Sequence, residues 1–449
     1  MSKTKGMTRR TFLRKASVAS ASAAAAPYVV SPASLGLAGA TAPSDRVVLG
    51  CIGMGGKGTG GMRNHMRWPD VQVAAVCDPN APRRQKARKL VEAHYAARKA
   101  SGAYKGCAAT GDFREVLARD DIDAVQVATQ DHWHVPLSIY AMRAGKDVYC
   151  EKPLSATVAE GQALIETARR TGRIFQHGTQ LRSLRNVRFA CELVRNGRIG
   201  DLHTIHIGSP NGQAGKNHPP APVPKTLDYD LWLGPAPWAP YTPARIPAFG
   251  WYFISDYSPS GWVAGFAVHD IDIAMWGMGA DGGLPGAVEI EGRGVYPRDG
   301  LHDTALSYHL EYTFSSNVRL ILDTLSPLGP KYGRSAHGVR FIGSDGWVFT
   351  RSGIDASPKS LLGSVIGPNE IHLYASIQHE RNFVDCVKSR RPTLTPPAVA
   401  HRTCSLCLLG DIAMRLGRKL TWDPVRQRFV DDAEADRWLS RPMREPWEV

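Results

Sequence analysis

Residues 46–78 constrain the fold more than any other part of the chain. Residues 46–52 form an apolar run of the length of a buried strand, and residues 53–58, Gly-Met-Gly-Gly-Lys-Gly, follow at once and fit the pattern G-x-G-x-x-G. A second apolar run, residues 71–77, ends in Asp78, twenty positions after Gly58. Strand, glycine-rich loop, helix, strand and acidic residue in this order predict a βαβ unit that binds a dinucleotide.

The glycine spacing has a physical explanation. The first glycine permits a tight turn, the second lets backbone amides approach a pyrophosphate, and the third allows the helix to pack close to the strand. The free amides at the helix N-terminus then face the phosphates. An ordinary tight turn between a strand and a helix is the structural alternative. We expect cofactor contacts from the whole loop: Gly53, Met54, Gly55, Gly56, Lys57 and Gly58.

Asp78 decides which dinucleotide is expected. Its carboxylate would accept hydrogen bonds from the ribose hydroxyls and repel a 2′-phosphate, which favours NAD. Arg83 and Arg84 lie just beyond it and leave NADP as an alternative.

The N-terminal segment has the form of a targeting signal. Residues 8–15, Thr-Arg-Arg-Thr-Phe-Leu-Arg-Lys, are followed by an Ala-rich stretch and by residues 38–40, Ala-Gly-Ala, which suit signal peptidase. A membrane anchor is the rival, but Pro27 and Pro32 interrupt the apolar stretch, so we expect no stable span after processing. Residues 1–42 are therefore predicted to be a twin-arginine signal peptide that engages the export machinery and directs the protein to the periplasm or outside the cell. Because that route exports folded proteins, we expect NAD to be tightly bound before export.

Length and charge limit the remaining possibilities. A chain of 449 residues is too long for one core, so we expect a Rossmann domain over residues 43–178 and a substrate-binding and oligomerisation domain over residues 179–449. The formal charge is +14. Six of the 55 lysines and arginines lie in the first 40 positions and the others are scattered along the chain, which argues against nucleic-acid binding. The eight cysteines form no disulfide framework, and Cys404-x-x-Cys407 lacks a second pair, so no metal site is predicted.

The apolar pattern changes near residue 179. Before it, buried strands at residues 122–128, 147–150 and 173–177 alternate with helices, as in a parallel sheet covered on both faces. After it, strands of alternating polarity predict an antiparallel sheet with one exposed face. The predicted fold class is α/β, with an N-terminal Rossmann doubly wound parallel sheet and a C-terminal α/β domain that contains a large, mostly antiparallel open sheet. The later strands are predicted at residues 202–208, 287–295, 305–314, 318–325, 339–342 and 347–351.

A resemblance emerges at residues 145–153, Gly-Lys-Asp-Val-Tyr-Cys-Glu-Lys-Pro. Together with the Gly53 loop, this chain resembles the Gfo/Idh/MocA oxidoreductase family, especially its secreted bacterial branch. The resemblance covers nearly the whole mature chain and implies a homo-oligomer that oxidises or reduces sugars or polyols with NAD(P). Further matching segments are residues 129–134, 176–183, 230–237 and 269–274.

Alcohol oxidation sends a hydride to the nicotinamide and a proton to a base. Lys152, at a strand end and followed by Pro153, would supply a cation beside the reacting oxygen. His269 would be the base, and Asp272, one helical turn on, would orient its ring. A surface lysine and a capping or core histidine are the structural alternatives.

Other site residues are expected from the matching segments and, for Asp256 and Tyr257, from their position just before His269, where they could offer hydrogen bonds and a flat aromatic face to a carbohydrate. Cofactor contacts are expected from Thr129, Asp131, His134, Glu151, Lys152 and Gln180, and substrate contacts from Arg182, Asp256, Tyr257 and His269.

One position departs from the family pattern. An aspartate commonly stands four residues before the histidine, and here that position is Gly265. Three functions are therefore kept: an exported NAD(P)-dependent sugar, glycoside or polyol oxidoreductase, a redox-neutral glycoside-cleaving enzyme with tightly bound NAD, and a non-catalytic member of the family that binds cofactor or sugar.

Overall fold

A computed structural model describes residues 42–284, 286–324 and 337–449. The predicted twin-arginine motif and cleavage site lie outside the described residues. Residues 42–46 belong to a separate N-terminal unit and contain a single 3-10 turn, Pro43–Asp45. Among the described residues, no helix is both long and apolar enough to cross a membrane.

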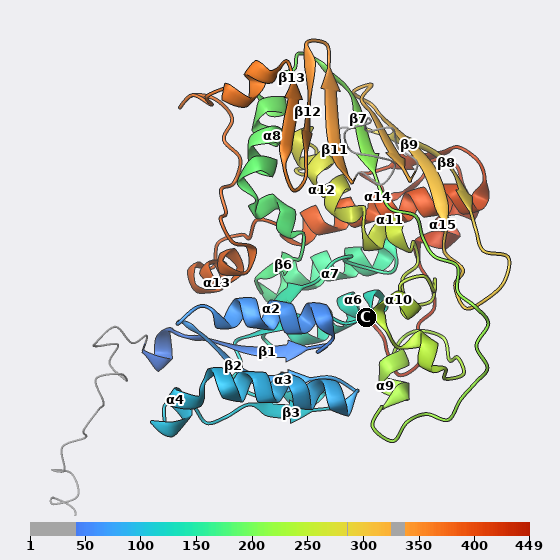
Figure 1. The fold of residues 1–449 in the computed structure, drawn as a ribbon. Coiled ribbons are helices and arrows are strands. Elements are labelled where there is room, and N and C mark those ends of the chain that lie inside the picture. The colour runs from blue at the N-terminus through green and yellow to red at the C-terminus, as the bar shows by residue number, and fades with distance from the viewer. Residues whose placement is uncertain (1–41, 285, 325–336) are drawn as a thin grey trace, which may run out of the picture. The chain divides into compact units, whose positions relative to one another are not determined.

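The first half of the chain forms a parallel sheet. Within the described residues it has six strands in the order β3-β2-β1-β4-β5-β6, which is the strand order of a Rossmann fold (Figure 1). Each strand is short, and β1 and β4 are almost wholly buried because helices cover both faces. The strands are β1 (Val47–Ile52), β2 (Val71–Cys77), β3 (Ala108–Thr110), β4 (Ala124–Val127), β5 (Asp147–Cys150) and β6 (Phe175–His177).

Local sequence signals explain where the helices of this sheet begin and end. The side chain of Thr157 accepts a hydrogen bond from the Glu160 amide at the start of α7, and Gly172, with φ of +63°, ends that helix. Helix α6 begins at Asp131, and an acidic residue is favourable in the first turn of a helix because its charge offsets the helix dipole. The helices are α2 (Gly56–Met66), α3 (Ala81–His94), α4 (Ala96–Ala100), α5 (Phe113–Leu117), α6 (Asp131–Arg143) and α7 (Val158–Thr171).

The second half contains a larger and mostly antiparallel sheet. Its nine strands among the described residues follow the order β13-β12-β11-β7-β10-β9-β8-β14-β15, and only β7 and β10 pair in parallel. Every second residue of β9 is buried, as predicted for a sheet with one open face. The strands are β7 (Leu202–Gly208), β8 (Val288–Val295), β9 (Ser307–Phe314), β10 (Arg319–Asp323), β11 (Gly338–Gly343), β12 (Gly346–Thr350), β13 (Ile354–Ser357), β14 (Leu420–Asp423) and β15 (Arg428–Phe429).

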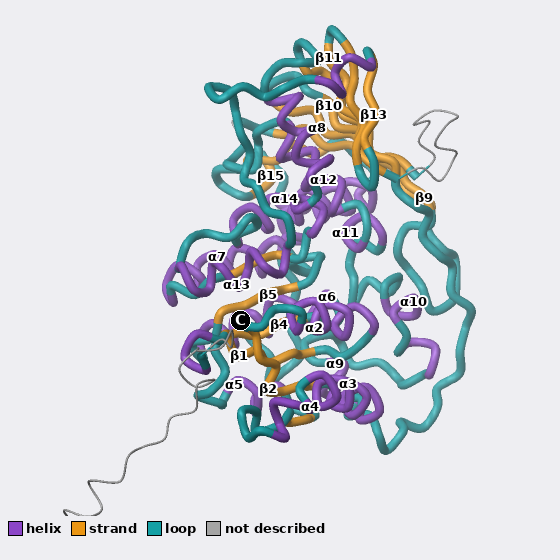
Figure 2. Tube along the Cα trace, turned by 60° about the vertical axis from the view of Figure 1, so that its left-hand side comes forward, coloured by secondary structure: helices purple, strands orange, loops and turns teal. Residues whose placement is uncertain are grey.

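Helices separate the two sheets. Figures 1 and 2 show α8, α12 and α14 on one face of the antiparallel sheet, on the side toward the Rossmann strands. A continuous hydrophobic core runs from Val125 of β4 through Ile271 of α12 to Ile205 of β7, which fixes the second sheet relative to the first. The helices of this half are α8 (Arg185–Arg195), α9 (Tyr229–Leu233), α10 (Ala248–Trp251), α11 (Trp262–Gly265), α12 (Val268–Gly277), α13 (His379–Ser389), α14 (Pro397–Leu416) and α15 (Ala433–Asp436).

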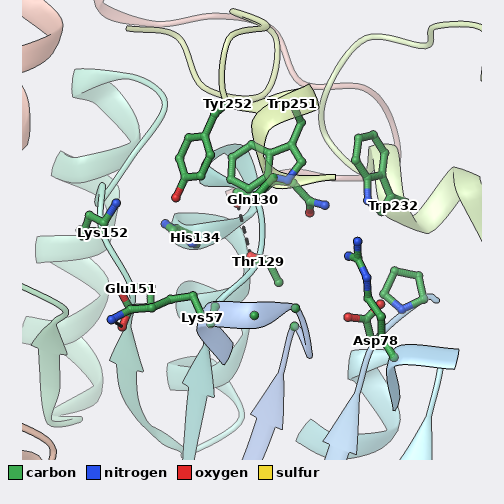
Figure 3. A pocket seen from close by; sticks show the side chains of 17 residues that line it. Lys57, Asp78, Thr129, Gln130, His134, Glu151, Lys152, Trp232, Trp251 and Tyr252 are labelled. Atoms are coloured by element: carbon green, nitrogen blue, oxygen red, sulfur yellow. Dashed lines mark hydrogen bonds and ion pairs between the residues drawn. The ribbon is translucent and has the colours of Figure 1, made fainter. Parts of the chain in front are cut away.

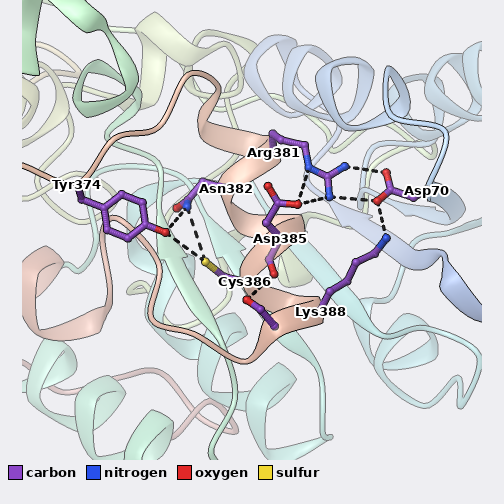
Figure 4. Close-up of polar contacts among 8 residues, drawn as sticks. Asp70, Tyr374, Arg381, Asn382, Asp385, Cys386 and Lys388 are labelled. Carbon is purple, nitrogen blue, oxygen red and sulfur yellow. Dashed lines mark hydrogen bonds and ion pairs between the residues drawn. The ribbon is translucent and has the colours of Figure 1, made fainter.

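Helix α13 comes late in the sequence but packs against the Rossmann half. Arg381 and Lys388 both donate to the carboxylate of Asp70, in the loop before β2, and Arg381 also lies 5.2 Å from the ring centroid of Trp68 (Figure 4). Burial would raise the pKa of Asp70, but the hydrogen bonds from these two cations lower it to about 2. The ion pairs therefore connect the two halves at a distance from the cofactor loop.

Candidate functional site

The glycine-rich loop has the backbone geometry that its spacing predicts. Gly53 has φ of +87°, and a Cβ atom there would lie 2.4 Å from the Ala128 carbonyl oxygen. A Cβ atom on Gly58 would lie 1.8 Å from the Gly53 carbonyl oxygen, so only glycine lets α2 approach the loop this closely. Gly55 and Gly56 have open space at the same position. The N-terminus of α2 thus borders an open cradle that suits a pyrophosphate.

Asp78 holds this loop as well as facing the cavity. Its Oδ2 accepts a hydrogen bond of 2.8 Å from the Met54 amide, and its Oδ1 accepts one of 2.8 Å from the Asn80 amide. Burial raises the pKa of the carboxyl group, and the two backbone hydrogen bonds and Arg83 oppose that shift. Carboxylate oxygens accept more than one hydrogen bond each, so Asp78 can hold the loop and still accept from a ribose.

A cavity of about 250 Å³ opens at the carboxyl ends of the parallel strands, where Rossmann folds bind their ligands (Figure 3). Predicted and unpredicted residues meet there. Trp232 and Tyr252 line the cavity but were not predicted as site residues. Trp232 could have been found from the sequence, because it lies inside segment 230–237, which matches the family pattern. The predicted residues that line the cavity are Gly53, Gly55, Gly56, Lys57, Asp78, Thr129, His134, Glu151 and Lys152.

A chain of polar contacts crosses the floor of this cavity. Glu151 lies 3.3 Å from the ammonium of Lys57 and accepts a hydrogen bond of 2.8 Å from the amide of Gln180, which also donates to the Tyr149 hydroxyl. Gln180 is therefore connected to the cavity through Glu151 and is not among the residues that line it. This arrangement anchors Glu151 next to the end of the glycine-rich loop.

Lys152 joins the two halves of the protein at the cavity wall. Its Nζ donates a hydrogen bond of 2.5 Å to the Gly265 carbonyl at the end of α11 and lies 5.5 Å from the ring centroid of Tyr252. Burial lowers the pKa of Lys152, while Asp131 and Glu151 raise it. An ammonium held between β5 and α11 can face an oxygen at the nicotinamide end of the cavity.

Two histidines lie near this ammonium. His134 Nδ1 is 2.6 Å from the Pro153 carbonyl oxygen, so it carries the proton and leaves Nε2 as an acceptor, and burial lowers the His134 pKa to about 4. His269 lies in the first turn of α12. Burial is the main cause that holds its pKa well below the ordinary value, and the charges of Lys152 and Arg351 add to this effect. Both imidazoles are therefore neutral near neutral pH. His134 lines the cavity, whereas His269, expected to contact substrate, is not among the residues that line it.

Asp272 does not orient His269, which corrects the expectation from their spacing. Its two oxygens accept hydrogen bonds from Arg182, with Nε–Oδ2 of 2.7 Å and Nη2–Oδ1 of 2.8 Å, and Thr403 donates to Oδ1. Asp281 binds the same guanidinium, and Arg182 is 1% exposed. Arg182 is thus neutralised inside the core rather than free to bind substrate.

Asp256, Tyr257 and Asp131 also lie elsewhere than expected. Tyr257 is fully buried, and its hydroxyl accepts a hydrogen bond from Arg245, so it cannot contact substrate as predicted. Asp256 lines a different cavity. Asp131 does not line the first cavity; its Oδ2 accepts a hydrogen bond of 2.5 Å from Ser258, and burial raises its pKa to about 7.

No group of three or more metal-binding side chains occurs in the part of the chain that the structure describes. The fit to a dinucleotide rests instead on the cradle at Gly55 and Gly56, the amides of α2 and the carboxylate of Asp78.

Comparison with known proteins agrees with this geometry. Residues 47–179 match the family model "Oxidoreductase family, NAD-binding Rossmann fold", and residues 192–449 match "Oxidoreductase family, C-terminal alpha/beta domain" of the same family. The solved scyllo-inositol dehydrogenase of Lactobacillus casei, with bound NAD(H) and scyllo-inositol, is 16% identical with a TM-score of 0.58, over 84% of this chain and 99% of that one. This likeness concerns the fold.

Curated relatives match a shorter part of the chain. A glycosyl hydrolase family 109 protein of Shewanella sp. (strain ANA-3) is 31% identical over 207 residues, which are 44% of this chain and 44% of the relative. An alpha-N-acetylgalactosaminidase of Shewanella oneidensis is 33% identical over 168 residues, 36% of this chain and 35% of the relative. The chain thus spans less than half the length of these relatives. Because the two family models cover residues 47–179 and 192–449, this protein belongs to the Gfo/Idh/MocA oxidoreductase family and has its NAD-binding Rossmann domain.

Proposed function

We propose that this protein transfers a hydride between NAD and a hydroxyl-bearing carbon of a sugar, glycoside or polyol. The observation that carries the proposal is the position of Lys152, whose ammonium borders the cofactor cavity and bonds to Gly265, four residues before His269. NAD, when bound, accepts the hydride. The chain itself must then supply a base for the hydroxyl proton and a donor for the carbinol oxygen.

Three side chains would share these tasks. The neutral imidazole of His269 takes the hydroxyl proton, and the ammonium of Lys152 stabilises negative charge on the oxygen. Tyr252 lines the cavity beside Lys152, and its hydroxyl points toward Lys152 and His134 in Figure 3. Burial holds the pKa of Tyr252 well above its ordinary value, so the phenol keeps its proton and donates a second hydrogen bond to the same oxygen.

The proposal is tested with purified protein, NAD and a panel of sugars, glycosides and polyols. The expected result is formation of a ketosugar together with NADH, and the NADH is measured by its absorbance. Protein that binds NAD but reduces none of it with any member of the panel, and releases no product, would instead support the non-catalytic alternative.

Redox-neutral glycoside cleavage is the second candidate, and the names of the relatives in Shewanella favour it. Oxidation of a ring hydroxyl makes the neighbouring C–H bond more acidic. Loss of that proton expels the aglycone, water adds to the resulting double bond, and the hydride returns to the ketone. Release of the aglycone without accumulation of NADH distinguishes this reaction from net oxidation.

Export and assembly complete the proposal. The twin-arginine form of residues 8–15 supports export to the periplasm or outside the cell, and a cofactor recycled in place suits a compartment without a nicotinamide pool. Tight NAD binding is tested by denaturing freshly purified protein and assaying the released nucleotide. A homo-oligomer is proposed on the family resemblance and is tested by light scattering.

A further inference from the structure

A second cavity lies apart from the cofactor site. It has a volume of about 410 Å³, within the usual range for small-molecule sites, and shares no lining residue with the first cavity. Its walls come from the start of α7, the segment before α11, the second half of α14 and the tail that follows α15. Asp256, expected from the sequence to bind substrate, faces this space.

Two guanidinium groups in the cavity form no ion pair with a carboxylate within the described residues, although the charge of Arg441 opposes the rise that burial causes in the pKa of Asp256 and of Glu160. Arg437 makes no side-chain hydrogen bond there, and Arg441 only a weak one, of 3.4 Å, to the Ser255 carbonyl oxygen. Arg415, in contrast, is bound to Asp411 through Nε and Oδ2 at 2.7 Å. The free donors of Arg437 and Arg441 favour an anionic group, since a planar guanidinium matches a carboxylate.

The opposite requirement comes from Asp411. Its residue is 6% exposed, and its Oδ1 is buried without a hydrogen-bond partner among the described residues. A desolvated acceptor of this kind costs free energy until a donor reaches it. Asp256 adds a second carboxylate to the same cavity, so a ligand there must present hydrogen-bond donors as well as an anion.

Apolar surface completes the cavity. Leu408, Ile412 and Pro259 line it, and the indole of Trp438 is 46% exposed at its edge. A flat aromatic face next to carboxylates suits the C–H face and the hydroxyls of a sugar.

We propose that this second cavity binds a saccharide that carries a carboxylate, either a uronic acid or an aldonic acid. The carboxylate would bind Arg437 and Arg441, and hydroxyl groups would donate to Asp411 and Asp256. None of these four side chains has a role in the hydride transfer proposed above. The second site can therefore exist whether or not that function is correct.

The test is calorimetric titration of the full-length protein, saturated with NAD, with D-glucuronate, D-gluconate and D-glucose. At least one of the two acids should bind, and glucose should bind about tenfold or more weakly, because a hydrogen bond between charged groups is lost. Arg437→Ala and Arg441→Ala should each weaken binding of the acid by about tenfold. Arg437 is exposed, so its variant keeps the test valid if Arg441→Ala fails to fold.

Arg426→Ala is the matched control, since this arginine lies outside the cavity with 78% of its side chain exposed. It should leave binding unchanged, as should Lys152→Met, which alters the first site. Glucuronate binding alone identifies a uronic acid, and gluconate binding alone identifies an aldonic acid. Equal affinity for glucose, no binding of either acid, or loss of binding in Lys152→Met but not in the arginine variants would overturn the proposal.

Discussion

Replacement of Lys152 by methionine removes one positive charge from the end of β5 and keeps a side chain of similar length. In the proposed reaction, the ammonium is a donor to the oxygen on which negative charge develops. Loss of one such donor lowers turnover by a factor of about 10² to 10³. NAD affinity should change little, because the open cradle at Gly55 and the carboxylate of Asp78 stay in place.

The same variant changes the expected pH dependence. Burial and, next, the charge of Lys152 hold the pKa of His269 below its ordinary value, so removal of the charge lets this pKa rise. A base works only while it is neutral. The acidic limb of the residual activity should therefore move to higher pH, measured as initial rate against pH with saturating substrate.

Lys146→Met is a matched control. Lys146 is buried and, like Lys152, donates to a backbone carbonyl, in this case that of Arg119, but it precedes β5 and does not line the cavity. It should leave the acidic limb where it is. Wild-type turnover in Lys152→Met, or the same shift of the limb in both variants, would refute the assigned role.

Three further variants test separate parts of the structure. Asp272→Ala leaves the buried guanidinium of Arg182 with Asp281, which is partly exposed, as its carboxylate partner. The free energy of unfolding in urea should therefore fall by about 3 kcal/mol, and an unchanged value would mean that the ion pair with Asp272 does not stabilise the fold. Asp78→Ala should weaken NAD binding and narrow its preference over NADP, measured by titration with each nucleotide, whereas equal loss for both would leave the carboxylate without a role in selection. Asp70 has a lowered pKa, so its ion pairs stabilise the fold above about pH 4 and this contribution is lost as pH falls toward 2. Asp70→Asn should lower the free energy of unfolding by about 2 kcal/mol at neutral pH, and the free energy of unfolding of this variant should depend less on pH between about 4 and 2.

The glycine-rich loop could be predicted from sequence because its physics is local. Gly53 and Gly58 each avoid a clash with backbone only a few residues away or on the adjoining strand, and this requirement fixes the spacing. The parallel sheet follows from the alternation of strand and helix, although this alternation alone does not fix the order of the strands, and the open antiparallel sheet follows from the alternating polarity of its strands.

The partners of charged side chains could not be predicted in this way. The spacing of Asp272 and His269 allows contact within one helix, but Arg182, ninety positions earlier, binds the carboxylate instead. Asp256 and Tyr257 were expected to act together, yet one faces a cavity and the other packs in an aromatic cluster with Trp232. Sequence neighbours do not predict which distant residue a charged side chain contacts, because a buried charge pairs with the group whose attraction and hydrogen bonds best offset the loss of its hydration.

Gly265 shows how such a contact can change a motif. A Cβ atom at this position would lie 3.2 Å from the Trp262 ring and 3.3 Å from the Tyr252 ring, so the space for the family's aspartate is partly filled by tyrosine. Gly265→Asp alone should therefore lower both the melting temperature and turnover, and Gly265→Ala should reproduce the thermal effect without adding a charge. In Gly265→Asp with Tyr252→Ala the crowding is relieved, and turnover should recover relative to Gly265→Asp alone if a carboxylate can replace the phenol beside Lys152. Full activity of the single variant, or no gain in the double variant, would mean that Tyr252 does not take the place of the missing acid.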